Sequence, residues 1–151
     1  MNLIFETALF NRKVLKNLID ELNYEQLIKI PENFNNSIFW NIAHILVTQQ
    51  LLVYEFSGLP KNIDDKLIAK FRKGTKATTD ISKEEIEYVK NNLIPIIEKT
   101  QEDFNKGLFK NYTSYHTSVD ISLNNIDDAI KFNAFHDGIH LGVILSLKKI
   151  V

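Results

Sequence analysis

The sequence of 151 residues contains no cysteine, and this absence excludes a disulfide framework, a thiolate metal site and a protein thiol nucleophile. An excess of positive charge is also missing, because 18 lysine and arginine residues stand against 19 aspartate and glutamate residues. Such a chain has no basic surface with which to neutralise phosphates, which argues against a nucleic-acid partner. The absence of cysteine does not fix the compartment but favours the cytoplasm. Residues 1–10 also lack the basic start that is expected of a targeting signal.

A run of residues that could cross a membrane is absent as well. Residues 33–54 carry no charge, but asparagine, glutamine, threonine and histidine interrupt the stretch too often for a helix that faces lipid. We therefore expect a helix buried in protein and no membrane partner. The hydrophobic fraction of 44% is typical of a globular protein, and a chain of this length can bury one core. A single domain over residues 1–151 is the prediction.

Apolar residues recur at steps of three and four through most of the chain, which is the period of an amphipathic helix. The first predicted helix covers residues 3–22, with Arg12 among the charged side chains of its solvated face. The second begins at Ser37, which suits an N-cap, and ends near Gly58.

Two further helices follow in the second half of the sequence. Ser82 and Glu85 have the spacing of a capping box, and Gly107 marks the end of the helix that they start. The last helix covers residues 125–149. The connections over residues 59–81 and 108–123 are longer than a simple up-down bundle needs. The sequence thus predicts an all-α fold, a four-helix bundle with long connections whose order is not simply up-down.

Three of the four histidines fall on inward-facing helix stripes. His136 and His140 are four residues apart, so they differ by about 40° in direction and about 6 Å in height on one helix. His44 lies on the stripe of the second helix. Two imidazoles from one helix and one from a facing helix would give a three-nitrogen metal site with an open position.

The three histidines could also be ordinary core or surface residues that bind no metal. The histidine-x-x-x-histidine pattern is a weak motif by itself, and such residues are often core or surface histidines without a metal. However, three buried imidazoles need polar partners, and one shared cation would satisfy all three.

Other polar residues near these stripes have weaker signals. Trp40, Thr48 and Asn133 could form a pocket wall or orient ligands and water, or could serve the core alone. Asp137 points about 100° away from its neighbour His136, which predicts a surface or dimer-face carboxylate. His116 is expected to be exposed in a loop, and the sequence leaves open whether it or the loop around Gly74 closes the pocket.

Two segments carry a resemblance to a known family. Residues 37–46 match a tryptophan-x-x-x-histidine start of a second helix, and residues 136–142 match a histidine-x-x-x-histidine-x-glycine motif in a last helix. Both motifs resemble those of the DinB/YfiT-like metalloenzymes, a large bacterial group of four-helix bundles, and the likeness covers essentially the whole chain. One departure is Val143, where many relatives have glutamine. Gly142 is expected to allow close helix packing.

The resemblance implies a function as well as a fold. It makes His44, His136 and His140 the ligands of a divalent metal ion, with zinc or nickel favoured and iron or manganese as alternatives. Some relatives are thiol-dependent transferases and isomerases, so a transferase that uses an external low-molecular-weight thiol is the leading hypothesis. A metal-dependent hydrolase is an alternative, although no inward carboxylate is expected beside the histidines. A non-catalytic, metal-stabilised binding or stress-response protein is the third. A small-molecule substrate and a homodimer are further expectations.

Overall fold

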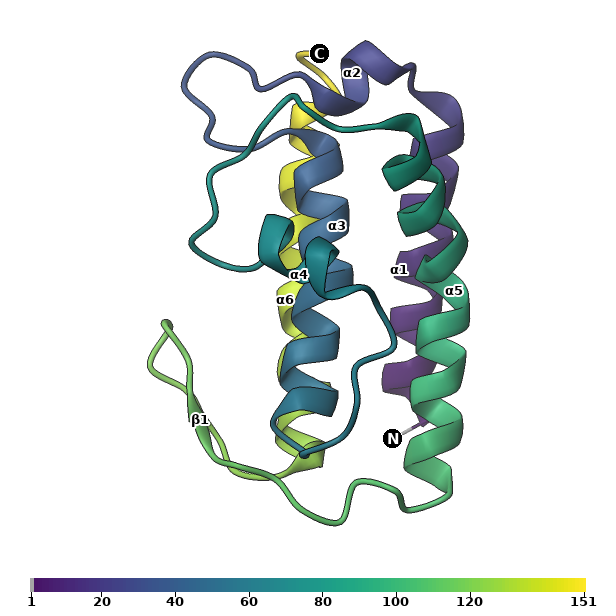
Figure 1. Cartoon of the computed structure of the whole chain (residues 1–151), viewed down its shortest axis with the longest axis vertical. Helices are drawn as coiled ribbons and strands as arrows, with labels where there is room; N and C mark the ends of the chain where they lie inside the picture. The colour runs from purple at the N-terminus through teal and green to yellow at the C-terminus, as the bar shows by residue number, and fades with distance from the viewer. Residues whose placement is uncertain (1) are drawn as a thin grey trace.

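The structure is a computed structural model, and it describes residues 2–151 as a bundle of long helices (Figure 1). The long helices are α1 (Asn2–Glu21), α3 (Ile38–Gln50), α5 (Lys83–Asn105) and α6 (Ile126–Leu147). The short elements are helix α2 (Tyr24–Ile28), the π-helical turn η1 (Leu51–Glu55), helix α4 (Asp65–Phe71) and strands β1 (Tyr115–His116) and β2 (Ser122–Leu123). The two strands pair antiparallel in one small hairpin. The prediction of an all-α helical bundle is confirmed.

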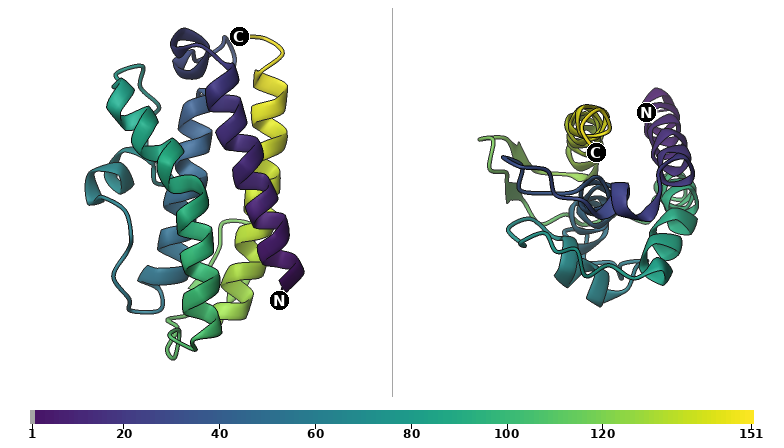
Figure 2. Two further views of the ribbon diagram at one scale, coloured as in Figure 1. Left: turned by 90° about the vertical axis from the view of Figure 1, so that its right-hand side faces the viewer. Right: turned by 90° about the horizontal axis from the view of Figure 1, so that it is seen from above.

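The order of the helices explains the first long connection. Helices α1 and α6 run in one direction, whereas α3 and α5 both run in the other (Figures 1 and 2). Among the long helices, α1 packs against α5 and α6, and α3 packs against α6 and less extensively against α5, which leaves α1 and α3 diagonal to each other. Because α3 and α5 are parallel, the chain between them must return along the length of the bundle. That return carries α4, and the order is therefore not simply up-down.

The helix boundaries agree with the capping signals of the sequence. The Ser37 side chain accepts a hydrogen bond from the backbone N–H of Trp40, at 3.1 Å. Ser82 and Glu85 form the predicted reciprocal capping box. These caps satisfy N–H groups that a helix start leaves without partners, so they fix where α3 and α5 begin.

Helix α3 lies at the centre of the hydrophobic core. Twelve of its thirteen residues are buried, which agrees with the prediction of a helix enclosed by protein. It packs on α6 on one side and on α4 on the other, where the rings of Phe39 and Phe71 meet edge to face. None of the helices within residues 2–151 has the length and apolar character that crossing a membrane requires.

Three predictions about single residues were wrong. Arg12 and Asp137 are both fully buried, with 3.1 Å between Nη2 of Arg12 and Oδ2 of Asp137. Arg12 follows Ala8 by four residues and precedes Leu15 by three, so its position on the apolar stripe of α1 outweighs its charge. Gly142 is exposed, and a Cβ atom there would meet no atom of residues 2–151 within 4 Å.

Candidate metal centre

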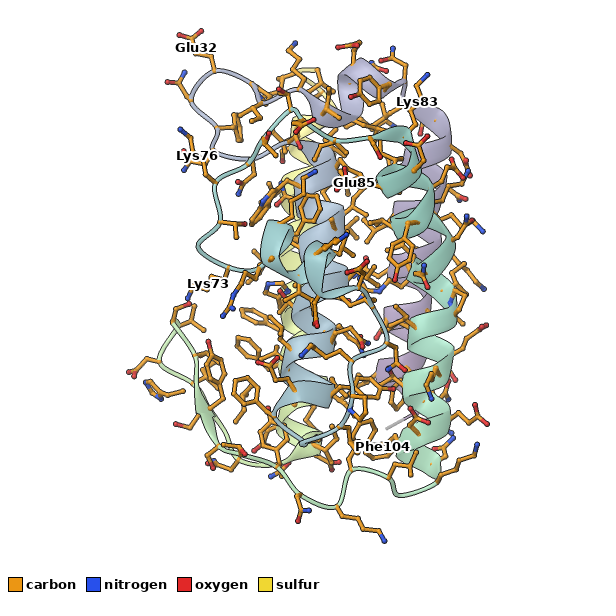
Figure 3. The ribbon with its side chains drawn as sticks, in the orientation of Figure 1. Glu32, Lys73, Lys76, Lys83, Glu85 and Phe104 are labelled. Atoms are coloured by element: carbon orange, nitrogen blue, oxygen red, sulfur yellow. The ribbon has the colours of Figure 1, made fainter. Side chains whose placement is uncertain are left out.

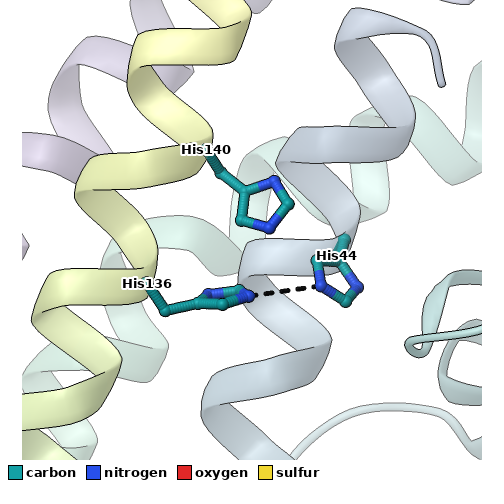
Figure 4. Close-up of side chains that lie close together, drawn as sticks. All are labelled: His44, His136 and His140. Carbon is teal, nitrogen blue, oxygen red and sulfur yellow. Dashed lines mark hydrogen bonds between the residues drawn. The ribbon is translucent and has the colours of Figure 1, made fainter. Parts of the chain in front are cut away.

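Three histidine side chains meet between α3 and α6 (Figure 4). His44 comes from α3, and His136 and His140 come from successive turns of α6. One ring nitrogen of each lies within 4.8 Å of the others, and the two Nε2 atoms of His44 and His136 are 3.3 Å apart. His44 is buried, and the other two are half-buried. The structure therefore brings together the three histidines that the sequence singled out, in a group that could hold a metal ion.

The tautomer of His44 follows from its partner on α4. Its Nδ1 atom lies 2.7 Å from the carbonyl oxygen of Phe71, the last residue of that helix. A carbonyl oxygen only accepts, so Nδ1 carries the proton and donates it. The neutral ring consequently has its lone pair on Nε2, the nitrogen that faces the other histidines.

A second network determines the tautomer of His140. The amide nitrogen of Asn41 donates to the carbonyl of Ser37 at 2.8 Å, so the amide oxygen of Asn41 is the atom that faces His140. This oxygen lies 2.8 Å from Nδ1 of His140 and accepts its proton. Nε2 of His140 then carries the lone pair, as it does in His44.

Burial keeps both rings neutral at pH 7. Desolvation is the main cause that lowers the pKa of His44 to about 4, against the opposing effect of the Phe71 hydrogen bond. Desolvation also lowers the pKa of His140 to about 3, with the nearby His136 as the next cause. Neutral imidazole is the form that binds metals, so neither ring has to lose a proton before it can act as a ligand.

His136 supplies the test of whether these residues fit a cation. Its buried Nδ1 atom has no hydrogen-bond partner within residues 2–151, and the nearest carboxylate oxygen, Oδ1 of Asp137, is 4.0 Å away. Its Nε2 atom lies 3.3 Å from Nε2 of His44, so His136 can donate a hydrogen bond to the lone pair of His44. A cation at the same place would bind that lone pair instead, and the unpartnered Nδ1 atom leaves His136 a second nitrogen to carry its own proton. The three residues therefore fit a metal ion.

A pocket of about 300 Å³ opens beside His44 and His136. Its walls come from α3, η1, the segment after α4, the hairpin and α6. The lining residues are His44, Thr48, Leu51, Leu52, Glu55, Phe56, Arg72, Lys73, Tyr115, Thr117, Ser118, Val119, Phe132, Phe135, His136 and Ile139. A volume of this size admits a small molecule, and an ion held by three protein ligands would keep a position open to such a molecule.

The other residues singled out by the sequence lie at different distances from the histidines. The Trp40 ring stacks on His44, with centroids 4.6 Å apart and planes at 13°. The Thr48 hydroxyl lies 3.3 Å from Nε2 of His44 and also lines the pocket. Asn133 lines a separate, smaller cavity beside Phe5. Trp40 and Thr48 are thus placed against a candidate ligand, whereas Asn133 faces α1.

The sequence left open whether His116 or the loop around Gly74 closes the pocket. Neither His116 nor Gly74 lines it, but residues next to each of them do. His116 is exposed, as predicted, and its ring nitrogens lie 3.0 Å from Ser122 and Asp120 of the hairpin. Its neighbours in the hairpin line the pocket. Residues 72–73, just before Gly74, also line it. Residues of both long connections therefore contribute to the pocket wall.

Sequence reasoning missed three residues that contribute to this site. Phe71 orients His44, and Asp64, the N-cap of α4, was a signal for that short helix. Asn41 orients His140, and its position three residues before His44 on one helix could have indicated this role. Glu55 lines the pocket, although no carboxylate was expected near the histidines. Glu55 follows His44 by eleven residues, which at about 100° per residue places both on nearly the same face of a helix, so this spacing could have indicated it.

The lowered pKa values of His44 and His140 predict that metal-free protein loses stability in mild acid. In the unfolded chain both rings take up a proton near pH 6.5, whereas in the folded chain they resist protonation until about pH 4 or below. The stability that the two neutral rings contribute to the folded protein is therefore fully present above pH 6.5, and it is lost as the pH falls toward their folded-state pKa values. We expect the free energy of unfolding to fall by about 2–4 kcal/mol from pH 7.5 to pH 5.

Urea unfolding at several pH values, in the presence of a chelator, measures this change. Because acidic groups also titrate, the comparison is with the double variant His44→Gln/His140→Gln, whose pH dependence should be clearly weaker. The control His116→Gln, changed at an exposed ring, should keep the wild-type dependence. Equal slopes for wild type and the double variant would contradict the prediction.

Comparison with protein families matches residues 9–144 to a single family model, described as the DinB superfamily. This range covers most of the chain and includes all three histidines of the cluster. No curated protein matches the sequence. The family match thus agrees with the resemblance seen in the two sequence motifs.

Proposed function

The chain belongs to the DinB superfamily, and from this membership and its histidine cluster we propose a metal-dependent enzyme in which His44, His136 and His140 bind one divalent ion. The observation that carries the proposal is that one ring nitrogen of each histidine points to a common centre. In His44 and His140 the second ring nitrogen, Nδ1, donates to an oxygen atom, so Nε2 is left as the ligand atom. Zinc or nickel is the preferred ion, with iron or manganese as alternatives, since three imidazoles suit several of these metals.

The leading specific activity is transfer to or from an external low-molecular-weight thiol. When bound, a divalent ion on three neutral imidazoles would lower the pKa of a thiol or a water molecule at its open position. The chain has no cysteine, so any thiol in the reaction must come from a second molecule. The pocket beside His44 and His136 supplies room for such a molecule and for an electrophilic substrate.

The residues around the cluster have defined roles in this proposal. Phe71 and Asn41 hold the rings of His44 and His140 through their Nδ1 protons, which keeps Nε2 directed at the ion. Trp40 restricts rotation of the His44 ring by stacking on it. The Thr48 hydroxyl donates to Nε2 of His44 in this structure, and it would become available to a group held in the pocket if Nε2 bound an ion.

A metal-dependent hydrolase is the alternative that a specific observation supports. Hydrolysis needs a base near the reacting water, and the Glu55 carboxylate lines the same pocket as His44 and His136. Its pairing with Lys61, at 2.9 Å, would have to be broken or shared for that role. A non-catalytic metal-stabilised protein is the third hypothesis, and it would require an ion without an exchangeable position.

The remaining parts of the proposal concern partners and location. We infer a small-molecule substrate from the size of the pocket. A homodimer follows from the family resemblance, and the exposed Leu3 and Phe10 of α1 give a second copy an apolar surface to cover. A cytoplasmic location and the absence of a nucleic-acid partner stay predictions from composition.

A cobalt-substituted sample tests the proposed thiol chemistry. Cobalt added to metal-free protein is expected to give the intense visible absorption of a low-symmetry site, which saturates near one ion per chain. Millimolar N-acetylcysteine should then add a thiolate charge-transfer band. N-acetylserine is the matched control, because it differs only in having oxygen instead of sulfur, and it should produce no such band.

The two stages of this experiment separate the hypotheses. If cobalt does not bind, the metal-dependent enzyme is contradicted. If cobalt binds but no thiol gives a new band, S-transfer is contradicted and hydrolysis stays as the better hypothesis. If neither thiols nor small anions such as azide change the spectrum, the ion has no open position, and the non-catalytic hypothesis is favoured.

A further inference from the structure

The charged and apolar residues of the pocket point to the chemical class of its ligand. We propose that the pocket takes a small organic anion with an apolar body, whose anionic group binds Arg72 and Lys73 while its body lies against α6 and the hairpin. The inference rests on the proposed function only in taking this pocket as the substrate site. It concerns the charged and apolar lining residues of the pocket other than His44 and His136.

The rim of the pocket has an excess of positive charge. Its charged lining residues, apart from the histidines, are Glu55, Arg72 and Lys73. Lys61 lies 2.9 Å from the Glu55 carboxylate and neutralises it. Within residues 2–151, Arg72 and Lys73 form no ion pair and their side chains donate no hydrogen bond. Two adjacent cations are therefore free to bind an anion.

Arg72 and Lys73 lie next in the chain to a residue that contacts the histidine cluster, and both line the pocket. They directly follow Phe71, whose carbonyl oxygen holds His44. Figure 3 shows Lys73 on the segment that faces the hairpin, with Lys76 farther along the same connection. An anion bound at the rim thus lies at the mouth of the pocket, on the α4 side.

Part of the pocket wall is apolar and exposed. Val119 of the hairpin connection and Phe135 and Ile139 of α6 keep 53%, 54% and 47% of their surfaces accessible, and all three line the pocket. Large apolar side chains that remain exposed around one concave site indicate a partner that covers them. The combination of this wall with a cationic rim favours an amphiphilic anion over a neutral or cationic ligand.

Three eight-carbon compounds test the inference: octanoate, octanol and octylammonium. Binding is measured by NMR titration of metal-free protein, so that the carboxylate has no metal ion to bind. We expect octanoate to bind at least about tenfold tighter than octanol, because hydrogen bonds to charged groups strengthen binding by this order. Octylammonium should bind most weakly. The shifted signals should include those of Arg72, Lys73 and Ile139.

Matched variants separate the effects of the pocket's cations and apolar residues from the effects of net charge and of surface hydrophobicity elsewhere. The double variant Arg72→Gln/Lys73→Gln should remove the preference for octanoate, whereas Lys66→Gln/Lys76→Gln, with the same change in net charge outside the pocket, should change affinity less than about twofold. Ile139→Ser should weaken all three compounds. Leu145→Ser, changed on the same helix at a residue 43% exposed and outside the lining, should not.

Several results would overturn the inference. These are equal affinity for octanoate and octanol, retention of the preference in Arg72→Gln/Lys73→Gln, or binding of octanoate only after zinc is added. The proposed metal function is judged separately, from zinc binding in the absence of these compounds. Zinc binding without discrimination among the compounds would contradict only the anion proposal. Discrimination without zinc binding would contradict only the metal proposal.

Discussion

Alanine in place of any one of His44, His136 and His140 is expected to lower zinc affinity by at least about a hundredfold. Loss of a group that merely orients a metal ligand already costs 10–100-fold, and removal of a ligand itself costs more. Each of the three imidazoles would be one of only three protein ligands, so no neighbouring side chain of the cluster can replace it. The wild-type protein is expected to keep nearly one ion per chain through gel filtration.

Elemental mass spectrometry of untagged protein measures the content, and competition with a chromophoric chelator measures the affinity. His116→Ala is the matched control, because it removes an imidazole that lies outside the cluster, and it should keep the wild-type ion. Circular dichroism shows whether each variant remains folded. A variant that keeps the ion with unchanged affinity would remove its residue from the ligand set, and a wild type that binds no supplied ion would refute the metal site.

Arg12→Met is expected to destabilise the protein by about 3–5 kcal/mol, the cost of removing one partner from a buried ion pair. Arg12 and Asp137 are both fully buried, and the pair gains little from the rest of the protein, because neither carboxylate oxygen has a hydrogen-bond partner within residues 2–151. Burial lowers the pKa of the Arg12 guanidinium, and the charge of Asp137 opposes that change. Without Arg12, the Asp137 charge would lie uncompensated between α1 and α6.

The double variant Arg12→Met/Asp137→Leu should recover most of that loss, since two apolar side chains can replace a buried pair at little cost. Thermal unfolding of metal-free protein measures the effect, and the single variant should melt roughly 10 °C lower, at about 2–4 °C per kcal/mol for a chain of this size. Lys148→Met is the control. It breaks a partly exposed pair with Glu21 that also joins the ends of α1 and α6, and it should cost less than about 1 kcal/mol. Equal effects of Arg12→Met and Lys148→Met would contradict the prediction.

The starts of α3 and α5 could be predicted from the sequence because residues next to each start determine where the helix begins. Ser37 and Ser82 satisfy the first N–H groups of their own helices, so a pattern of a few residues is sufficient to find them. The convergence of the histidines was also accessible, because spacing places His136 and His140 on one face of a helix. The apolar stripe of the second predicted helix placed His44 facing inward as well, and the family resemblance then implied that the three histidines are metal ligands.

What the sequence did not reveal depends on contacts between distant segments. Helix α4 has seven residues, too few to be stable alone, and it forms where Leu67, Ile68 and Phe71 can be buried against the core. The hairpin has two residues in each strand and no alternating pattern long enough to detect. Arg12 was misplaced because its charge was given more weight than its position on the apolar stripe, and only the buried partner Asp137 makes that position tolerable.

The separation of the ligands along the chain has a consequence for biosynthesis. His44 and His136 are 92 residues apart, and His44 is held by a carbonyl that belongs to a third segment, α4. A nascent chain that has exposed only α3 therefore presents a single imidazole to the cell. Even the pair on α6 would compete poorly for scarce metal until the bundle closes around it. If the proposed site binds an ion, acquisition of the ion would therefore follow closure of the bundle.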